Sequence, residues 1–283
     1  MRDNGAFRQP VKGKSMQHRP KKRFGQNFLR DQQVVEQIIE AADLESTDNL
    51  LEIGPGLGAL TDRLLPCVGQ LHVMELDRGL AAALQARPEA NLQVHMGDAL
   101  RLDWGQLLVE PPYKLVANLP YNISSQILFK ILDNRQLFSR LVLMFQQEVG
   151  DRLCAEPNSK QYGILSVLCQ NYFDIRRVVR VPPGAFFPPP KVHSVVLCFD
   201  ALDQPRVAVA DEVFFRRVVK GAFGQRRKTL RNSLKGAGLA FEGLNEAMEG
   251  IGIDGGRRAE TLTLEEFGAL AEMLRCRLAE ESC

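Results

Sequence analysis

The stretch LLEIGPGLGALT, residues 50–61, decides the fold of this chain. It begins with an apolar run typical of a buried strand and continues into a helical pattern. Between the two parts lie Gly54, Gly56 and Gly58. Glycine permits a sharp turn and a close approach of the backbone to a ligand, in front of a helix N-terminus whose free N–H groups face that ligand. The stretch therefore predicts a strand, a nucleotide-binding loop and a helix.

The segments that follow alternate between short apolar runs and helical patterns. Four further strands are predicted from apolar runs, at residues 70–77, 92–100, 113–121 and 140–149. Helical patterns lie among them, as at 78–86 and 124–133. Such alternation indicates βαβ units and a parallel sheet covered by helices on both faces, which is an α/β fold.

The two ends of the chain differ from this central part. Residues 1–20 mix Gly, Pro, Lys and Arg without apolar periodicity, which predicts a disordered basic tail. Residues 176–199 predict two more strands joined by a proline-stiffened loop, and strand signals then stop near residue 205. We therefore expect one α/β domain over residues 21–203 and a small helical domain over residues 204–283.

Composition restricts the class of protein. The chain has 283 residues and is 45% hydrophobic, which is enough for one large core or one large and one small core. No apolar run approaches the roughly 18 residues of a membrane span, and no secretory signal is evident. The six cysteines form no C-x-x-C pair, so we expect free thiols, no metal site and a cytoplasmic protein.

Basic residues are concentrated in two places. Residues 1–30 contain nine Lys or Arg and one Asp, and residues 211–238 contain eight Lys or Arg and two acidic residues. Since the net charge of the chain is only +2, the remainder is acidic. Two basic islands on an otherwise acidic protein indicate a polyanionic partner.

Two carboxylates follow the next predicted strands. Glu75 ends the strand after the glycine loop, and Asp98 ends the one after that. A carboxylate in the first position can accept hydrogen bonds from both hydroxyls of a ribose, and one in the second can accept a bond from an adenine amino group. Either could instead cap a helix. NAD and S-adenosylmethionine both present an adenosine, and the loop alone does not separate them.

The tetrapeptide NLPY, residues 118–121, favours methyl transfer to an amino group. The exocyclic nitrogen of adenine is a poor nucleophile because its lone pair is delocalised into the ring. Acceptors for both of its N–H groups would draw it toward tetrahedral geometry, and the Asn118 side-chain oxygen and the Leu119 carbonyl supply them. Pro120 stiffens the turn and lacks an N–H, while Tyr121 can stack on a flipped base. A hydride-transfer enzyme has no use for this arrangement.

In its motifs the chain resembles the ribosomal RNA adenine dimethyltransferases. The resemblance covers about nine-tenths of the chain and follows eight segments in order: FGQNFL (24–29), LEIGPGLGALT (51–61), ELDRGLA (75–81), GDAL (97–100), NLPYNISS (118–125), FFPPPKVHS (186–194), RRKTLRN (226–232) and RAETLTLEEF (258–267). It implies a Rossmann-like, seven-stranded S-adenosylmethionine-dependent methyltransferase sheet with a small all-helical C-terminal domain.

The resemblance also implies roles for individual residues. Asn27 and Leu29 would close over the cofactor, and Phe186 would face Tyr121 across the target base. The sequence alone does not exclude the adjacent Phe187 from that place, but a core position is favoured for Phe187. The residues expected to line S-adenosylmethionine, with the other loop glycines in support, are Gly54, Gly56, Glu75, Asp98 and Asn118.

Within this family the chain looks most like the bacterial small-subunit enzyme linked to kasugamycin sensitivity. That enzyme dimethylates two adjacent adenines near the 3′ end of 16S rRNA, which implies a monomer whose partner is rRNA in a pre-ribosomal particle. The alternatives are a large-subunit methylase of the antibiotic-resistance type, a non-catalytic assembly checkpoint factor and, third, a nicotinamide dehydrogenase.

The segment GQRRKTLRNSL, residues 224–234, is predicted to be a helix that binds rRNA phosphates. Arg227, Arg231 and Lys235 are spaced four apart and would share one face, while Leu230 and Leu234 would anchor another. The expected RNA contacts are Arg226, Arg227, Lys228 and Arg231, with Lys21, Lys22 and Arg23 as a second set. The alternative is an ordinary solvated helix surface.

Overall fold

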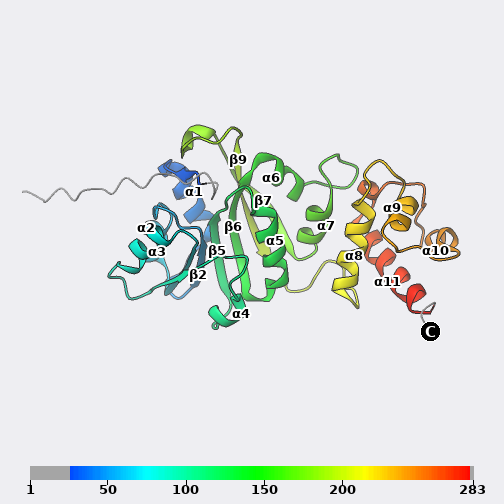
Figure 1. Cartoon of the computed structure of the whole chain (residues 1–283), viewed down its shortest axis with the longest axis horizontal. Helices are drawn as coiled ribbons and strands as arrows, with labels where there is room; N and C mark the ends of the chain where they lie inside the picture. The colour runs from blue at the N-terminus through cyan, green and yellow to red at the C-terminus, as the bar shows by residue number, and fades with distance from the viewer. Residues whose placement is uncertain (1–25, 281–283) are drawn as a thin grey trace, which may run out of the picture.

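The computed structural model describes residues 26–280 and has an elongated shape (Figure 1). A seven-stranded sheet occupies the middle, and four helices form the end opposite α2 and α3 (Figure 1). The strands of this sheet are β2 (Asn49–Ile53), β3 (Gln70–Glu75), β4 (Leu92–Met96), β5 (Tyr113–Asn118), β6 (Phe138–Gln146), β7 (Phe173–Val181) and β9 (Ser194–Ala201). A separate two-stranded sheet pairs β1 (Phe28–Leu29) with β8 (Phe186–Phe187).

The large sheet has the order β4-β3-β2-β5-β6-β9-β7. From β4 to β6 all neighbours pair in parallel, which confirms the predicted α/β fold. The prediction of a parallel sheet is wrong for β9, which runs antiparallel to both β6 and β7. The reason is the connection: residues 182–193 contain no helix long enough for a crossover, so the chain turns back and Ser194 pairs with Val181.

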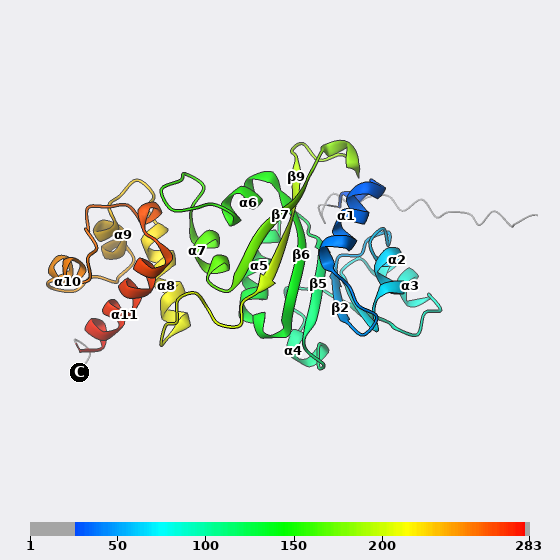
Figure 2. The same ribbon diagram turned by 180° about the vertical axis from the view of Figure 1, so that it is seen from behind.

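Successive strand residues point to opposite faces of the sheet and contribute to two separate clusters of buried side chains. In β6, Leu141, Leu143 and Phe145 belong to one cluster, and Val142 and Met144 belong to the other. Figure 2 shows α1 against the sheet. The helices on the Val142 face are α1 (Gln32–Ala42), α2 (Thr61–Leu64) and α3 (Arg78–Gln85). Those on the Leu141 face are α4 (Trp104–Leu107), α5 (Ser124–Asp133), α6 (Gln147–Leu153) and α7 (Ile164–Gln170).

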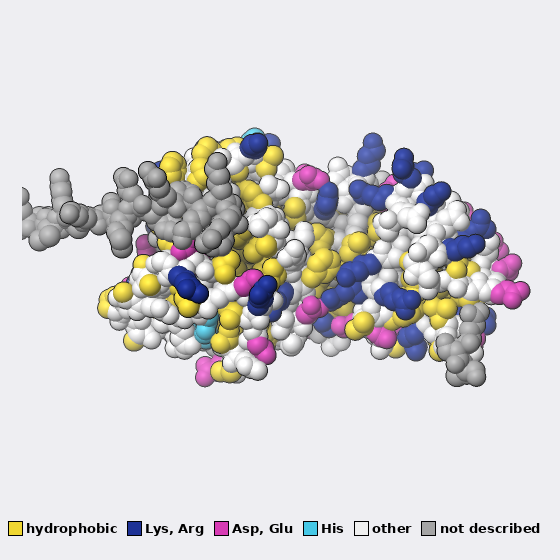
Figure 3. Space-filling model, viewed as in Figure 1, with side chains coloured by type: hydrophobic (Ala, Val, Ile, Leu, Met, Phe, Trp, Pro, Cys, Tyr) yellow, Lys and Arg dark blue, Asp and Glu magenta, His cyan; other side chains and the backbone are white. Residues whose placement is uncertain are grey.

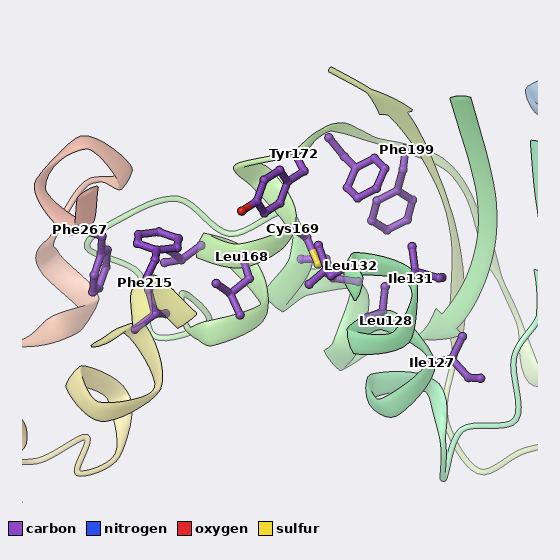
Figure 4. Packing of buried hydrophobic residues seen from close by; sticks show 14 of the residues in the cluster. Ile127, Leu128, Ile131, Leu132, Leu168, Cys169, Tyr172, Phe199, Phe215 and Phe267 are labelled. Carbon is purple, nitrogen blue, oxygen red and sulfur yellow. The ribbon is translucent and has the colours of Figure 1, made fainter. Parts of the chain in front are cut away.

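The C-terminal part of the described chain is helical, as predicted. Its helices are α8 (Glu212–Phe223), α9 (Leu230–Gly236), α10 (Leu244–Gly250) and α11 (Leu264–Glu280). Figure 4 shows how buried side chains run from Ile131 of α5 through Leu168 of α7 to Phe215 and Phe267. The predicted boundary after residue 203 lies in the segment between β9 and α8, and separate folding of the two parts stays a prediction. The predicted tail over residues 1–20 lies outside the described residues.

The expectation of one helix through residues 224–234 is wrong. Helix α8 ends at Phe223, residues 224–227 form turns, and α9 begins at Leu230. The break starts at Gly224, and glycine is about 1 kcal/mol less favourable than alanine inside a helix. Arg227 therefore does not share a helical face with Arg231.

Candidate active site

A cavity of about 190 Å³ lies at the carboxyl ends of β2, β3, β4 and β5. This is where ligands bind in open α/β sheets, because the loops that leave neighbouring parallel strands meet there. Residues of β1 and its approach also line the cavity. The predicted residues that line it are Asn27, Leu29, Gly54, Gly56, Glu75, Asp98, Asn118, Leu119, Pro120 and Tyr121. The tertiary structure thus brings together five separate segments of the sequence.

The glycine loop follows β2 directly. All three of its glycines have positive φ, +70° at Gly54, +59° at Gly56 and +87° at Gly58, a region that other residues rarely adopt. At Gly56 an added Cβ would stand 3.0 Å from the ring of Phe28. The loop is therefore held against β1, and a side chain at Gly56 would be both strained and crowded.

Glu75 joins the glycine loop to the start of α3. One carboxylate oxygen accepts a hydrogen bond from the backbone N–H of Gly56 at 3.2 Å, and the other accepts one from Asp77 at 2.8 Å. Burial raises the pKa of this carboxyl, while the two backbone hydrogen bonds act in the opposite direction. The sequence left open whether Glu75 caps a helix or binds a ligand. In the structure it orders the backbone before α3 and also lines the cavity.

Asp98 lies just after β4 and, like Glu75, both orders the backbone and lines the cavity. Its Oδ1 accepts a hydrogen bond from the backbone N–H of Leu100 at 2.9 Å, which orders the turn that follows. The guanidinium of Arg101 is 3.7 Å from Oδ2 and mostly exposed to solvent. Asp98 also lines the cavity, two strands away from the glycine loop.

The NLPY turn presents two free acceptors beside the cavity. The Asn118 amide donates from Nδ2 to the backbone carbonyl of Asn27 at 3.1 Å, and within the described chain its Oδ1 accepts no hydrogen bond. The carbonyls of Pro120 and Tyr121 are occupied by Ile123 N–H and by the Ser124 hydroxyl. No hydrogen bond to the carbonyl of Leu119 occurs within residues 26–280. The Asn118 oxygen and the Leu119 carbonyl are thus the acceptors that remain.

Tyr121 is held by its hydroxyl group. The hydroxyl lies 2.7 Å from Ser194 Oγ, at the start of β9. Burial raises the pKa of this phenol, and the hydrogen bond lowers it by a smaller amount. The ring is therefore anchored at its far end in the un-ionised form, half-buried at the edge of the cavity.

The two phenylalanines of β8 differ in burial: Phe186 is buried, and Phe187, which was expected in the core, is exposed. Phe187 is 45% exposed, with the guanidinium of Arg30 at 4.1 Å from its ring centroid, so it is not a core aromatic. Phe186 is 4% exposed and belongs to the cluster on the α1 face. It does not line the cavity, but it pairs across the small sheet with Leu29, which does.

The cavity lining also includes residues that were not predicted from the sequence, and two of them, Phe28 and Glu52, shape the site. Phe28 contacts Gly56 from β1, and its signal was the aromatic residue inside FGQNFL. Glu52 is 1% exposed on β2, and its signal was a single acidic residue within the apolar run LLEIG. A carboxyl that folding removes from water in this way needs a compensating partner, or it takes up a proton and so loses its negative charge.

Among the described residues, three carboxyl groups line the cavity, those of Glu52, Glu75 and Asp98, and no Lys, Arg or His of residues 26–280 does so. Such a lining suits a ligand with hydroxyl groups, amino groups and positive charge. It opposes a pyrophosphate, which would bring two negative charges among carboxylates. The residues present therefore fit S-adenosylmethionine, whose sulfonium and amino groups are cationic, better than a nicotinamide dinucleotide.

The expected RNA contacts lie at the other end of the molecule. Arg226, Arg227 and Lys228 are exposed in the turn between α8 and α9, and Arg231 is exposed in the first turn of α9. Arg226 donates to the carbonyl of Lys160 at 2.6 Å, which ties this turn to the loop before α7. Figure 3 shows Lys and Arg side chains over this end of the molecule.

The leucines predicted to anchor the basic helix are buried, whereas the second predicted set of RNA contacts lies in a part of the chain that the structure does not describe. Leu230 and Leu234 are fully buried, as expected for residues that attach α9 to its neighbours. Lys21, Lys22 and Arg23 lie outside the described residues. Within residues 26–280 no group of three or more His, Cys, Asp or Glu side chains is arranged to hold a metal ion, and no helix is both long and apolar enough to cross a membrane.

Comparison with known proteins identifies a family for nearly the whole chain. Residues 17–275 match the family described as ribosomal RNA adenine dimethylase. The chain is 74% identical over 260 residues to ribosomal RNA small subunit methyltransferase A of Syntrophotalea carbinolica, an alignment that covers 92% of this chain and 98% of that protein. The protein of the same name from Geobacter metallireducens is 51% identical over 263 residues, covering 90% of this chain and 96% of that protein.

Solved structures with the same architecture include a dimethyladenosine transferase and an rRNA methyltransferase. A dimethyladenosine transferase from Plasmodium falciparum superposes with a TM-score of 0.75 at 25% identity, covering 90% of this chain and 98% of that one. The 23S rRNA methyltransferase ErmE superposes with a TM-score of 0.65 at 26% identity, covering 88% of this chain and all of that one. These matches confirm the predicted methyltransferase fold with additional helices.

Proposed function

The chain belongs to the ribosomal RNA adenine dimethylase family, and we propose that it dimethylates two adjacent adenines near the 3′ end of 16S rRNA with S-adenosylmethionine. The small-subunit assignment is supported by a relative that is 74% identical over nearly its full length and is named for the small subunit. The large-subunit alternative is less well supported, because the 23S rRNA methyltransferase ErmE is only 26% identical.

The observation that carries the proposal is the pair of unoccupied acceptors at the cavity edge. We place the two N–H groups of the target adenine on the Asn118 oxygen and the Leu119 carbonyl. Accepting both hydrogens draws the nitrogen lone pair out of conjugation, which is worth most in the transition state. Pro120 adds no competing donor to the turn. Tyr121 would stack on the base, and Phe186, which is buried outside the cavity lining, would have to turn toward Tyr121 to face it across the base.

The cofactor supplies a sulfonium-bound methyl group that is already electrophilic. Glu75 would accept hydrogen bonds from the ribose hydroxyls, and Asp98 would accept one from the adenine amino group of the cofactor. The backbone at Gly54 and Gly56 allows close approach, and Asn27 and Leu29 of the β1 segment would close the site. In each transfer the target nitrogen would take the methyl group as the bond between that carbon and the sulfonium sulfur breaks, and it would then lose one proton to solvent. The residues of the chain contribute positioning and hydrogen bonding.

Recognition of rRNA is assigned to the basic surface of the C-terminal helices. Arg226, Arg227, Lys228 and Arg231 would contact phosphates of the folded RNA, with Lys21, Lys22 and Arg23 as a second contact. We further propose that the protein acts as a monomer in the cytoplasm, without a metal ion, on a pre-ribosomal particle during small-subunit biogenesis.

The deciding experiment uses methyl-labelled S-adenosylmethionine with unmethylated small subunits and, in parallel, large-subunit rRNA. After nuclease digestion we expect labelled dimethyladenosine only from small-subunit rRNA. Label in the large-subunit RNA would replace this proposal with the resistance-type activity. Tight subunit binding without label in either RNA would favour a non-catalytic assembly factor.

A further inference from the structure

Of the carboxyls that line the cavity within residues 26–280, Glu52 is the one to which the proposed function gives no role. It lies in β2 between Leu51 and Ile53, 1% exposed, and it lines the cavity. Its neighbours along the strand belong to the cluster on the opposite face of the sheet. Strand alternation therefore turns Glu52 toward the face that carries α2.

The surroundings of Glu52 leave one of its oxygens without a partner. Thr61 of α2 donates from its hydroxyl to Oε2 at 2.7 Å, and within residues 26–280 Oε1 accepts no hydrogen bond. The charged groups that face it are Glu75 from β3, Asp62 from α2 and Arg87 after α3. Arg87 is already paired with Asp62 at 2.5 Å and with Glu89 at 2.8 Å, so it is not dedicated to Glu52.

This environment favours the protonated form of Glu52 when the cavity holds no cation. Burial raises its pKa to about 8, with Glu75 and Asp62 adding to the shift and the Thr61 hydrogen bond and Arg87 opposing it. A positive charge placed in the cavity would act in the opposite direction, because it stabilises the carboxylate.

We propose that Glu52 is a specificity-determining residue which gives up its proton when S-adenosylmethionine binds and retains it when S-adenosylhomocysteine binds. The inference rests on the proposed function, since it assumes this cofactor. The two ligands differ by the methyl group and the positive charge of the sulfonium. Because the part of the cavity lining that the structure describes has three carboxyls and no basic side chain, that charge favours the carboxylate form of Glu52.

The consequence is a donor preference that depends on pH. Between the pKa of Glu52 with the donor bound and its value of about 8 in the free protein, donor binding releases a proton. Affinity for S-adenosylmethionine therefore rises with pH in this range, by at most about tenfold per pH unit, and levels off above it. Affinity for S-adenosylhomocysteine lacks this contribution, so the product is displaced more readily at higher pH.

Calorimetric titration of the full chain with each ligand measures this without any RNA or turnover. Titrations at pH 6.5, 7.5 and 8.5, in two buffers of different ionisation enthalpy, give the number of protons released. For the wild type at pH 7.5 we expect release at least about half a proton larger with S-adenosylmethionine than with S-adenosylhomocysteine. The amino group of each ligand also titrates, so the comparison with variants isolates Glu52.

Three variants complete the design. Glu52→Gln, which keeps the shape and still accepts from Thr61, should abolish the excess release and most of the pH-dependent preference. Thr61→Val removes the hydrogen bond that lowers the pKa of Glu52, so it should move the release to higher pH. Glu40→Gln, an exposed neutralisation on α1, should behave as the wild type.

The outcomes separate this inference from the proposed function. Equal proton release with the two ligands in the wild type, or an excess that persists in Glu52→Gln, would overturn the role of Glu52 alone. If Glu52→Gln did not fold, an unchanged pH range in Thr61→Val would have the same force. Failure of both ligands to bind the wild type would overturn the cofactor assignment together with this inference.

Discussion

The side-chain amide of Asn118 donates a hydrogen bond to the backbone carbonyl of Asn27, 91 residues earlier in the chain, at 3.1 Å. This contact fixes which end of the amide faces the cavity, because the nitrogen is the donor and the oxygen is left free. It also joins the end of β5 to the segment that leads into β1. One hydrogen bond therefore both orients the proposed acceptor and closes one wall of the cavity.

Replacing Asn118 with Ala should abolish the proposed acceptor while leaving the RNA surface intact. We expect methyl transfer to fall by at least about 100-fold, the scale seen when one preorganised hydrogen-bonding group is removed from an active site. Binding of rRNA should change less than twofold. The measurement is single-turnover methylation of small subunits beside a filter-binding assay. Gln136→Ala, which truncates an exposed amide, is the control. Unchanged turnover in Asn118→Ala would remove this residue from the mechanism.

Gly56→Ala should weaken cofactor binding through backbone strain and crowding. The residue has φ +59° and its new Cβ would meet the Phe28 ring at 3.0 Å. A left-handed conformation costs a residue with a Cβ about 1–2 kcal/mol, so we expect roughly tenfold or greater loss of affinity in calorimetry. Gly184→Ala is the matched control, since its Cβ meets nothing within 4 Å. An affinity equal to that of the wild type would show that the loop has freedom that its geometry does not suggest.

The exposed turn between α8 and α9 should contribute phosphate contacts. In the double variant Arg227→Ala with Lys228→Ala, rRNA binding should weaken and depend less steeply on salt. Each lost contact should flatten the plot of log K against log salt by about 0.7–0.9. The double variant Arg63→Ala with Arg152→Ala removes the same charge from exposed ion pairs of the sheet domain and should keep the wild-type slope. Equal slopes for the two double variants would return the turn to an ordinary solvated surface.

Phe186 and Phe187 can be separated by volume-conserving changes. Phe186→Leu preserves most of the packing, so the melting temperature should fall only slightly, while loss of the aromatic face should lower kcat/KM about tenfold. Phe187→Leu should leave kcat/KM near the wild-type value, since its ring packs against Arg30 and does not line the cavity. The reverse pattern, with activity lost only in Phe187→Leu, would assign base stacking to the exposed ring.

The sequence by itself determined the order of strands and helices, the chemistry of the loop and the family. These features depend on neighbours in the chain: apolar runs, glycines that permit positive φ, and short motifs such as NLPY. For the same reason Glu75, Asp98 and Asn118 could be predicted at strand ends. Both the α/β fold and the membership of the rRNA adenine dimethylase family were confirmed.

Tertiary structure decided what depends on residues far apart in the sequence. It reversed β9 between β6 and β7, interrupted the basic helix at Gly224 and placed the ring of Phe187 outside the core. It also placed Glu52, which lies in an apolar run of the sequence, in the wall of a cavity whose described lining has no basic side chain. Register, burial and the electrostatic surroundings of a carboxyl arise only when separate segments pack together. A local pattern can therefore mark an unusual residue such as Glu52 but cannot say what surrounds it.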